Sequence, residues 1–183
     1  QSTGTGGDAA EIFLIGVGTT TDILLQNSGS RLTSNVGDIR LRANTIQLDG
    51  GVQGNGTLQI DPRLFGTSVG IGDGAAGTLN FTAAEVANIQ NGFSEIRIGN
   101  ADVSETRINA ITFNDPINID SDTIFIDGQL TGAGDASITL RDTQGFSTTT
   151  LSADIVTNGN VVTIDDHLVV DGARTIDTTN GGS

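Results

Sequence analysis

The sequence contains no cysteine, lysine, methionine, tryptophan or tyrosine, and its 183 residues include one histidine. The absence of cysteine excludes disulfides and thiol chemistry. With phenylalanine as the sole aromatic residue type, the core must be built mainly from Ile, Leu, Val and Ala. No run of about 18 apolar residues occurs and no basic segment precedes an apolar one, so neither a transmembrane helix nor a signal peptide is predicted. Because the chain starts at Gln1, we expect a processed precursor or a fragment of a longer protein.

Positive charge is scarce. Eight arginines stand against 22 acidic residues, which gives a net charge of −14. A nucleic-acid interface needs clustered cations, and the closest arginine pair is Arg40 and Arg42, two positions apart on one face of a predicted strand. We therefore expect no nucleic-acid partner and no membrane insertion. Self-repulsion keeps an acidic polymer soluble, and such a surface suits a cation-rich exterior.

Short stretches of alternating apolar residues recur from Ile12 to Ile176, separated by Gly, Asn or Asp. Alternation of this kind predicts many short strands, each with one buried face. Residues 1–11 lack it, and we interpret them as a flexible lead-in to a single elongated domain over residues 12–183.

Internal repetition indicates how the strands are arranged. The stretch 39–56 matches 117–134, an offset of 78, and the stretch 111–120 aligns without gaps onto 162–171, an offset of 51. Related strands with variable corners favour a parallel β-solenoid, in which equivalent strands stack about 4.8 Å apart. Coils of about 20 residues would give on the order of nine coils. A β-sandwich uses the same alternation and is the alternative fold.

The segment 81–93 departs from the strand pattern and predicts a short helix near residues 82–91. Thr82 is the expected N-cap, Glu85 completes a capping box, and Gly92 is the expected stop. Val86 and Ile89 would share one face, so that the helix covers one flank of the core.

Two stretches, GTLNFTAAEVANIQNGFSEIRIGNAD (77–102) and NVVTIDDHLVVDGARTIDTTNGG (160–182), resemble the large β-strand-repeat surface proteins related to filamentous haemagglutinin-type adhesins of Gram-negative bacteria and cyanobacteria. The resemblance implies secretion to the cell surface, a role in adhesion or in a biofilm matrix, and a right-handed parallel β-helix. No catalytic motif belongs to the family pattern, so it implies no site residues.

The residues themselves offer little for catalysis. His167 aligns with Pro116 in the internal repeat, a position that does not require a titratable group. Asp115, Asp120, Asp122 and Asp127 are close in sequence, as the carboxylates of a glycosidase could be, but tryptophan and tyrosine platforms for sugars are missing. We predict no enzymatic activity and no catalytic, cofactor-binding or metal residues.

Calcium is the one cofactor for which the sequence offers ligands, because Asp-rich corners supply the hard oxygen atoms that this ion prefers. The candidate pairs are Asp120 with Asp122 and Asp165 with Asp166. The stretch 70–79 loosely resembles a single copy of the calcium-binding nonapeptide repeat, which normally occurs in tandem. The glycines of 16–22 lack the Gly-Lys-Ser/Thr of a P-loop, so we interpret them as turns.

These observations predict a structural component of an extracellular fibre, sheath or surface shaft that self-associates through open β edges or stacked ends. A calcium- or glycan-dependent adhesive module is the alternative function. Strand exchange through residues 11–16 between β-sandwich subunits is an alternative mode of assembly.

Overall fold

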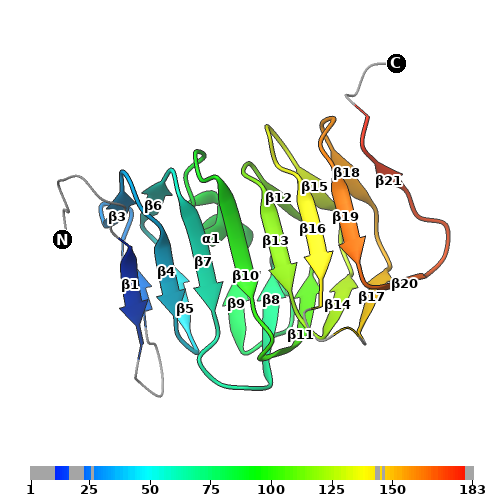
Figure 1. Cartoon of the computed structure of the whole chain (residues 1–183), viewed down its shortest axis with the longest axis horizontal. Coiled ribbons are helices and arrows are strands. Elements are labelled where there is room, and N and C mark those ends of the chain that lie inside the picture. The colour runs from blue at the N-terminus through cyan, green and yellow to red at the C-terminus, as the bar shows by residue number, and fades with distance from the viewer. Residues whose placement is uncertain (1–10, 17–22, 26, 143–144, 146, 180–183) are drawn as a thin grey trace.

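A computed structural model describes residues 11–16, 23–25, 27–142, 145 and 147–179, and it forms a parallel β-solenoid with one short helix (Figure 1). Every recorded strand pair is parallel, for example β1 with β4 and β4 with β7. The solenoid prediction is therefore confirmed, and the sandwich alternative is wrong. The lead-in predicted for residues 1–11 lies, apart from Glu11, outside the described residues.

We number the coils 1 to 7 in chain order. Each described coil except coil 3 contributes one strand to each of three faces, which we call face 1, face 2 and face 3, and coil 3 contributes no strand to face 3. Face 1 is one continuous sheet of β1 (Ile12–Ile15), β4 (Ile39–Arg42), β7 (Thr57–Asp61), β10 (Glu95–Gly99), β13 (Ile117–Asp120), β16 (Ile138–Arg141) and β19 (Val162–Asp165). Face 2 consists of two sheets: the pair β2 (Ile23–Leu25) and β5 (Ile46–Leu48), and a sheet of β9 (Leu79–Phe81), β8 (Thr67–Ile71), β11 (Val103–Ile108), β14 (Thr123–Ile126), β17 (Thr148–Leu151) and β20 (His167–Val170). Face 3 likewise consists of the pair β3 (Arg31–Ser34) and β6 (Gly51–Gly54), and a sheet of β12 (Ile111–Phe113), β15 (Leu130–Gly132), β18 (Ile155–Thr157) and β21 (Ile176–Asp177).

Two aliphatic ladders on face 1 form the centre of the core. Side chains alternate between inward and outward along each strand, so inward residues of neighbouring coils stack in register. One ladder consists of Ile12, Ile39, Leu58, Ile96, Ile117, Ile138 and Val162. The other consists of Leu14, Leu41, Ile60, Ile98, Ile119, Leu140 and Ile164. The members in coils 2 to 6 are buried, whereas those in the first and last coils are partly buried.

The described chain makes seven coils, fewer than the nine expected from a uniform length of about 20 residues. Coil 3 causes much of the difference, because 38 positions separate Leu58 from Ile96, which are register neighbours on face 1. Its extra residues build β8, β9 and the helix. The repeat offset of 78 holds in the structure, since Ile39 and Ile117 occupy the same ladder three coils apart.

The offset of 51, in contrast, does not reflect structural equivalence. It aligns Ile111 of β12 on face 3 with Val162 of β19 on face 1. The true register partner of His167 is Thr148, which itself pairs with Thr123. Alternation is the same on every face, so a match of apolar positions does not specify the face.

The predicted helix exists but is shorter than expected. Helix α1 (Ala83–Ala87) begins at the N-cap Thr82, and Thr82 and Glu85 form the predicted capping box. It ends at Asn88 rather than Gly92, because Ile89 forms a parallel bridge with Val52 of β6. The helix contacts β5, β9 and β12, and Val86 is buried, so it covers one flank of the core as predicted.

The connection from β8 to β9 runs back across the outer surface of β8. A Cβ atom on Gly77 would lie 2.3 Å from the backbone nitrogen of Gly70. This close approach of two backbones requires glycine. As a result β9 pairs on the side of β8 that faces the first two coils, and β11 pairs on the other side.

Candidate functional surfaces

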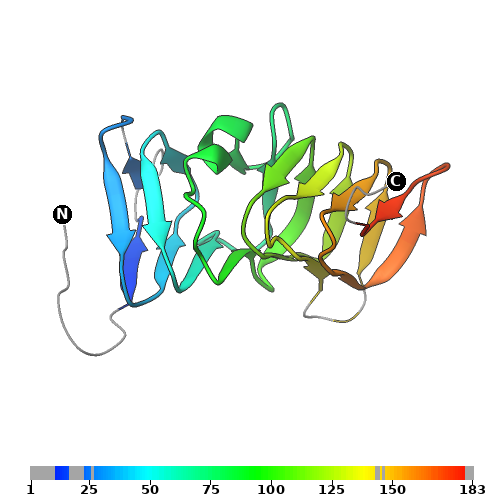
Figure 2. The ribbon, with the colours of Figure 1, turned by 90° about the horizontal axis from the view of Figure 1, so that it is seen from above.

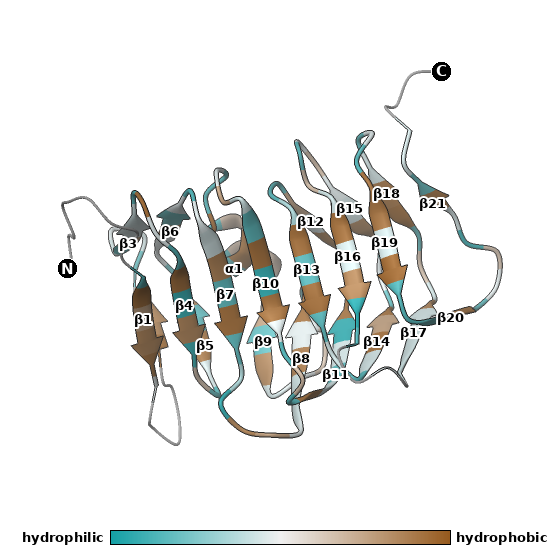
Figure 3. Ribbon diagram, in the orientation of Figure 1, coloured by the Kyte–Doolittle hydropathy of each residue, from teal (hydrophilic) through white to brown (hydrophobic). Residues whose placement is uncertain are grey.

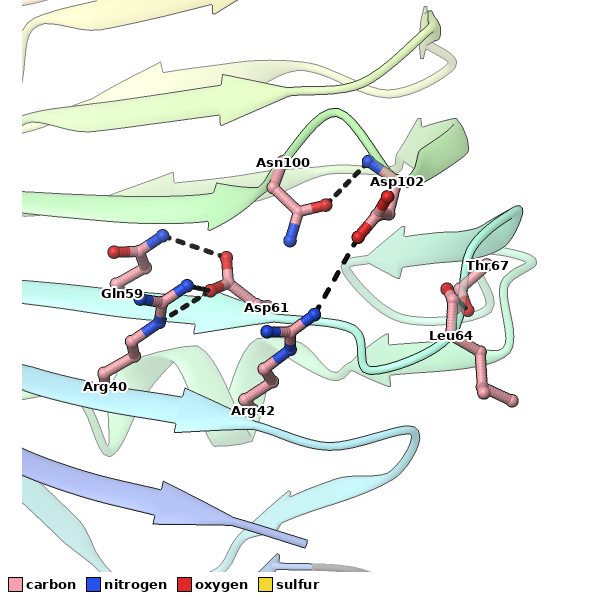
Figure 4. A network of polar contacts seen from close by, with 8 residues as sticks. All are labelled: Arg40, Arg42, Gln59, Asp61, Leu64, Thr67, Asn100 and Asp102. Atoms are coloured by element: carbon pink, nitrogen blue, oxygen red, sulfur yellow. Dashed lines mark hydrogen bonds and ion pairs between the residues drawn. The ribbon is translucent and has the colours of Figure 1, made fainter. Parts of the chain in front are cut away.

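The polar residues on the outside of face 1 form ion pairs rather than an open site (Figure 4). Nε and Nη2 of Arg40 both donate to Oδ2 of Asp61, at 2.9 and 2.7 Å. Nε2 of Gln59 donates to the other carboxylate oxygen at 3.1 Å, and Asp61 is fully buried. One oxygen of the Asp61 carboxylate therefore has a charged donor, Arg40, and the other has a neutral donor, Gln59. A buried anion requires such hydrogen bonds.

Arg42 lies two positions after Arg40 on the same outward side, as predicted. Its Nη2 atom is 3.9 Å from Oδ2 of Asp102, in the corner that follows β10. Arg97 pairs with Glu95, and Nη2 of Arg141 lies 3.5 Å from Oδ2 of Asp120. These four arginines of face 1 are therefore matched by carboxylates in the same coil or one or two coils away.

The four candidate carboxylates of a glycosidase have separate environments. Asp115 is buried before β13 and accepts the backbone N–H of Gly92 at 2.8 Å. Asp120 and Asp122 flank the corner between faces 1 and 2, and Asp127 follows β14, where it pairs with Arg107 at 2.9 Å. Asp120 and Asp122 thus share one corner, while Asp115 and Asp127 lie at two others.

Asp115 lies in an environment that changes its electrostatics. Desolvation by burial raises the pKa of its carboxyl group above the ordinary value. The backbone N–H groups of Gly92 and Phe93 oppose that shift, because they bind the charged form, while Asp135 adds a smaller repulsion. The role that this geometry supports is to hold the segment that leads into β10.

Acidic residues stack at the corner between faces 1 and 2 in the last three coils. Burial raises the pKa of Asp122, with a further contribution from the negative charge of Asp142 in the next coil. Burial also raises the pKa of Asp166, to which Asp142 and Asp165 contribute repulsion. The sequence singled out Asp122, Asp165 and Asp166 but not Asp142, which strand register alone brings between them.

This acidic corner is not accompanied by a formed metal centre. Among the residues that the structure describes, no group of three or more His, Asp or Glu side chains could hold a metal ion. The stretch 70–79, which echoes a calcium-binding repeat, is the crossing between β8 and β9. Within it, Oδ1 of Asp73 accepts the N–H of Ala83 at the start of α1, at 2.9 Å. Most of the predicted turn at residues 16–22 lies outside the described residues.

His167 is exposed at the first position of β20, and its backbone N–H donates to Oδ1 of Asp166 at 3.2 Å. The hydroxyl of Thr149 donates to Oδ2 of the same aspartate at 2.8 Å. Asp166 therefore binds a backbone amide and a hydroxyl, a pattern typical of a structural corner.

A groove of about 490 Å³ lies beside α1 on the outside of face 3. Ala83 and Ala87 of the helix form one side, and Thr112, Asn114, Gln129 and Thr131 supply hydroxyl and amide groups. Nε2 of Gln129 donates to Oγ1 of Thr131 at 3.2 Å. No pattern in the sequence predicted this groove, because the groove depends on where the helix packs.

The last described coil exposes apolar side chains that are buried at equivalent positions in earlier coils. Leu168 and Val170 are 38% and 50% exposed, whereas their register partners Thr149 and Leu151 are buried. Ile176 is 40% exposed and pairs with the buried Ile155. Figure 2 shows these strands at the end of the stack.

Searches against protein-family models, curated proteins and solved structures found no match for this chain. Within the described residues, no helix is long and apolar enough to cross a membrane.

Proposed function

We propose that this chain is a structural shaft segment of an extracellular bacterial fibre, sheath or surface structure, and that copies associate through stacked coil ends. The observation that carries the proposal is the exposed inward side of the last coil, where Leu168, Val170 and Ile176 continue the apolar ladders. A further coil laid on this edge would pair its backbone and bury these side chains.

The first coil presents inward residues of the same kind. Ile12 and Leu14 of β1 are partly buried members of the core ladders, and Leu32 of β3 is partly buried against the core. Figure 3 shows apolar residues along the face 1 strands from β1 to β19. Stacking the first coil of one copy on the last coil of another would therefore match apolar with apolar positions, and the acidic exterior would keep the resulting shaft soluble.

Electron microscopy and sedimentation velocity of the 1–183 chain test the proposal. We expect unbranched filaments with an axial repeat of about 34 Å per copy, since seven coils are each about 4.8 Å apart. Val170→Glu, which places a charge on the inward side of β20, is expected to abolish them. Val169→Glu is the matched control, because Val169 is 41% exposed and points outward in the same strand.

Each outcome is informative provided that both variants retain the unfolding midpoint of the parent chain. Equal loss of filaments in the two variants would favour lateral association through outer surfaces over stacked ends. Monomers at all protein concentrations in the unmodified chain would contradict self-association of this segment.

A glycan-binding module is the second candidate, and the groove beside α1 is the observation that favours it. Thr112, Asn114, Gln129 and Thr131 offer the neutral hydroxyl and amide groups that hydrogen-bond sugars. A glycan array probed with the chain, with and without calcium, tests this function. Binding that Gln129→Ala removes would support it, whereas binding that is unchanged by this variant would exclude this groove.

A further inference from the structure

The boundary between β5 and β9 on face 2 differs from the other strand boundaries. The two strands contact each other, but no ladder pairs them within the described part of the chain. Instead, the N–H of Leu48 donates to Oε1 of Glu85 at 3.1 Å. Nδ2 of Asn88 donates to the carbonyl oxygen of Leu48 at 2.7 Å. Two side chains from α1 and its C-cap thus provide the acceptor and the donor that a neighbouring strand would supply.

The same Glu85 carboxylate is also part of the helix cap. Its Oε2 atom accepts the N–H and the hydroxyl of Thr82, each at 2.9 Å. The cap fixes the carboxylate in the position from which it reaches Leu48. Formation of the first turn of α1 and connection of β5 to coil 3 therefore depend on one side chain.

Face 3 is also weakly connected at this level. Val52 of β6 forms a single isolated bridge with Ile89, through bonds to Asn88 and Gln90 at 2.9 and 2.8 Å. The ladder of β12 runs to β15 on its other side, and among the described residues no ladder joins residues 88–90 to β12. On face 1, in contrast, β4, β7 and β10 pair residue by residue.

We propose that coil 3 is a joint in the shaft, at which coils 1 and 2 swing relative to coils 4 to 7 about the continuous ladder of face 1. The side chains of Glu85 and Asn88 act as the latch that holds face 2 closed, and the bridge between Val52 and Ile89 is the link on face 3. Local opening starts at the boundary with the fewest hydrogen bonds, and at this level face 2 has two side-chain links and face 3 has one isolated bridge in place of ladders. The inference concerns a single chain and is independent of whether copies assemble.

Hydrogen–deuterium exchange of latch variants provides the first test. Asn88→Asp replaces the donor to Leu48 by an acceptor, and Glu85→Ala removes the acceptor. We expect exchange in residues 46–54 to accelerate about tenfold, as loss of a hydrogen bond that limits local opening would produce. Exchange in residues 57–60 and 96–98 of face 1 should not change.

Asp73→Ala is the matched control, because Asp73 caps the N–H of Ala83 but has no recorded bond to β5. If weakening the helix alone released β5, this variant would accelerate residues 46–54 as much as Glu85→Ala does. That result would contradict the latch. Uniform acceleration over all coils in the latch variants would contradict the joint, since the solenoid would then open as one unit.

Spin-label distances test the direction of the motion, and the lack of native cysteine makes labelling selective. One labelled pair, Thr33→Cys with Val156→Cys, spans coil 3 along face 3. A second pair, Phe13→Cys with Thr139→Cys, spans the same coils along face 1. In the Asn88→Asp background we expect the distance distribution of the face 3 pair to broaden and that of the face 1 pair to remain. Equal broadening of both pairs, or of neither, would overturn the proposal.

Discussion

Arg40 donates two hydrogen bonds to a single oxygen of Asp61, and the two residues differ sharply in exposure. The Asp61 side chain is fully buried, whereas a third of the Arg40 side chain is exposed to solvent, at 33%. The free-energy cost of removing Arg40 therefore differs from the cost of removing the charge of Asp61. An arginine that loses its partner can turn to water, but a buried carboxylate cannot.

We accordingly expect Arg40→Ala to lower the free energy of unfolding by about 3 kcal/mol, because it leaves the buried anion with Gln59 as its side-chain donor. Asp61→Asn keeps the shape and an acceptor for Arg40, so its cost should be about 1 kcal/mol. Urea denaturation of the two variants measures the difference. The reverse order would mean that Asp61 is solvated in solution.

The crossing between β8 and β9 contains two positions, Gly74 and Gly77, that favour glycine for different structural reasons. A Cβ on Gly77 would meet the backbone of Gly70 at 2.3 Å, whereas Gly74 has a φ of +73° and a Cβ there would lie at an ordinary contact distance, 3.8 Å, from the side-chain nitrogen of Asn109. Gly74→Ala should cost about 1 kcal/mol, the penalty of a left-handed backbone. Gly77→Ala should cost about 3 kcal/mol or more, since the crossing must lift away from β8. Thermal unfolding distinguishes the two, and similar costs would argue against the close approach.

The core ladders predict that position along the shaft determines the effect of a cavity. Ile119 is fully buried in coil 5, and Ile164 is a partly buried member of the same ladder in the last coil. At low protein concentration, Ile119→Ala should destabilise by about 3 kcal/mol and Ile164→Ala by about 1 kcal/mol. If copies stack, the cost at Ile164 should increase with concentration, as measured by denaturation over a dilution series.

Stability should increase on mild acidification. The folded pKa values of Asp115, Asp122 and Asp166 are raised above the ordinary value of 3.8, so the folded state binds protons before the unfolded state does. The free energy of unfolding therefore rises as the pH falls from about 7 through the raised pKa values toward about 4. The high net negative charge acts in the same direction.

The variant Asp115→Asn should reduce that rise, because it removes the most buried of the three groups. Asp177→Asn is the control, since Asp177 is half-buried and its pKa is lowered by hydrogen bonds from Thr179, which gives the opposite sign. Denaturation at several pH values provides the measurement. A steady loss of stability between pH 7 and about pH 5 in the parent chain would contradict the prediction.

The features that the sequence predicted correctly depend on neighbours along the chain. Alternation around Ile39 and Ile117 specified short strands and a common ladder, and the Thr82–Glu85 pair specified the start of the helix. The predicted end of the helix was wrong because Ile89 pairs with Val52, which lies 37 positions earlier in the chain. Local propensity cannot anticipate such a tertiary contact.

The candidate surfaces were harder to predict, because they arise from stacking. Asp142 lies near Asp122 and Asp166 through strand register, and Glu85 reaches Leu48 through the packing of α1. A capping box predicts where a helix begins, but it does not reveal that the same carboxylate binds a strand. The offset of 51 was misleading because inward positions look alike on all three faces.

The pairing of β7 with β10 has a consequence for how such chains vary in length. Because these strands stay adjacent on face 1, the 38 positions between Leu58 and Ile96 add the rise of a single coil. The additional sequence adds β9 as a further strand of face 2 and places the crossing and α1 on the flank of the shaft, while β7 and β10 remain paired on face 1. Insertions at this level therefore change the outline of the protein without interrupting the strand pairing of face 1.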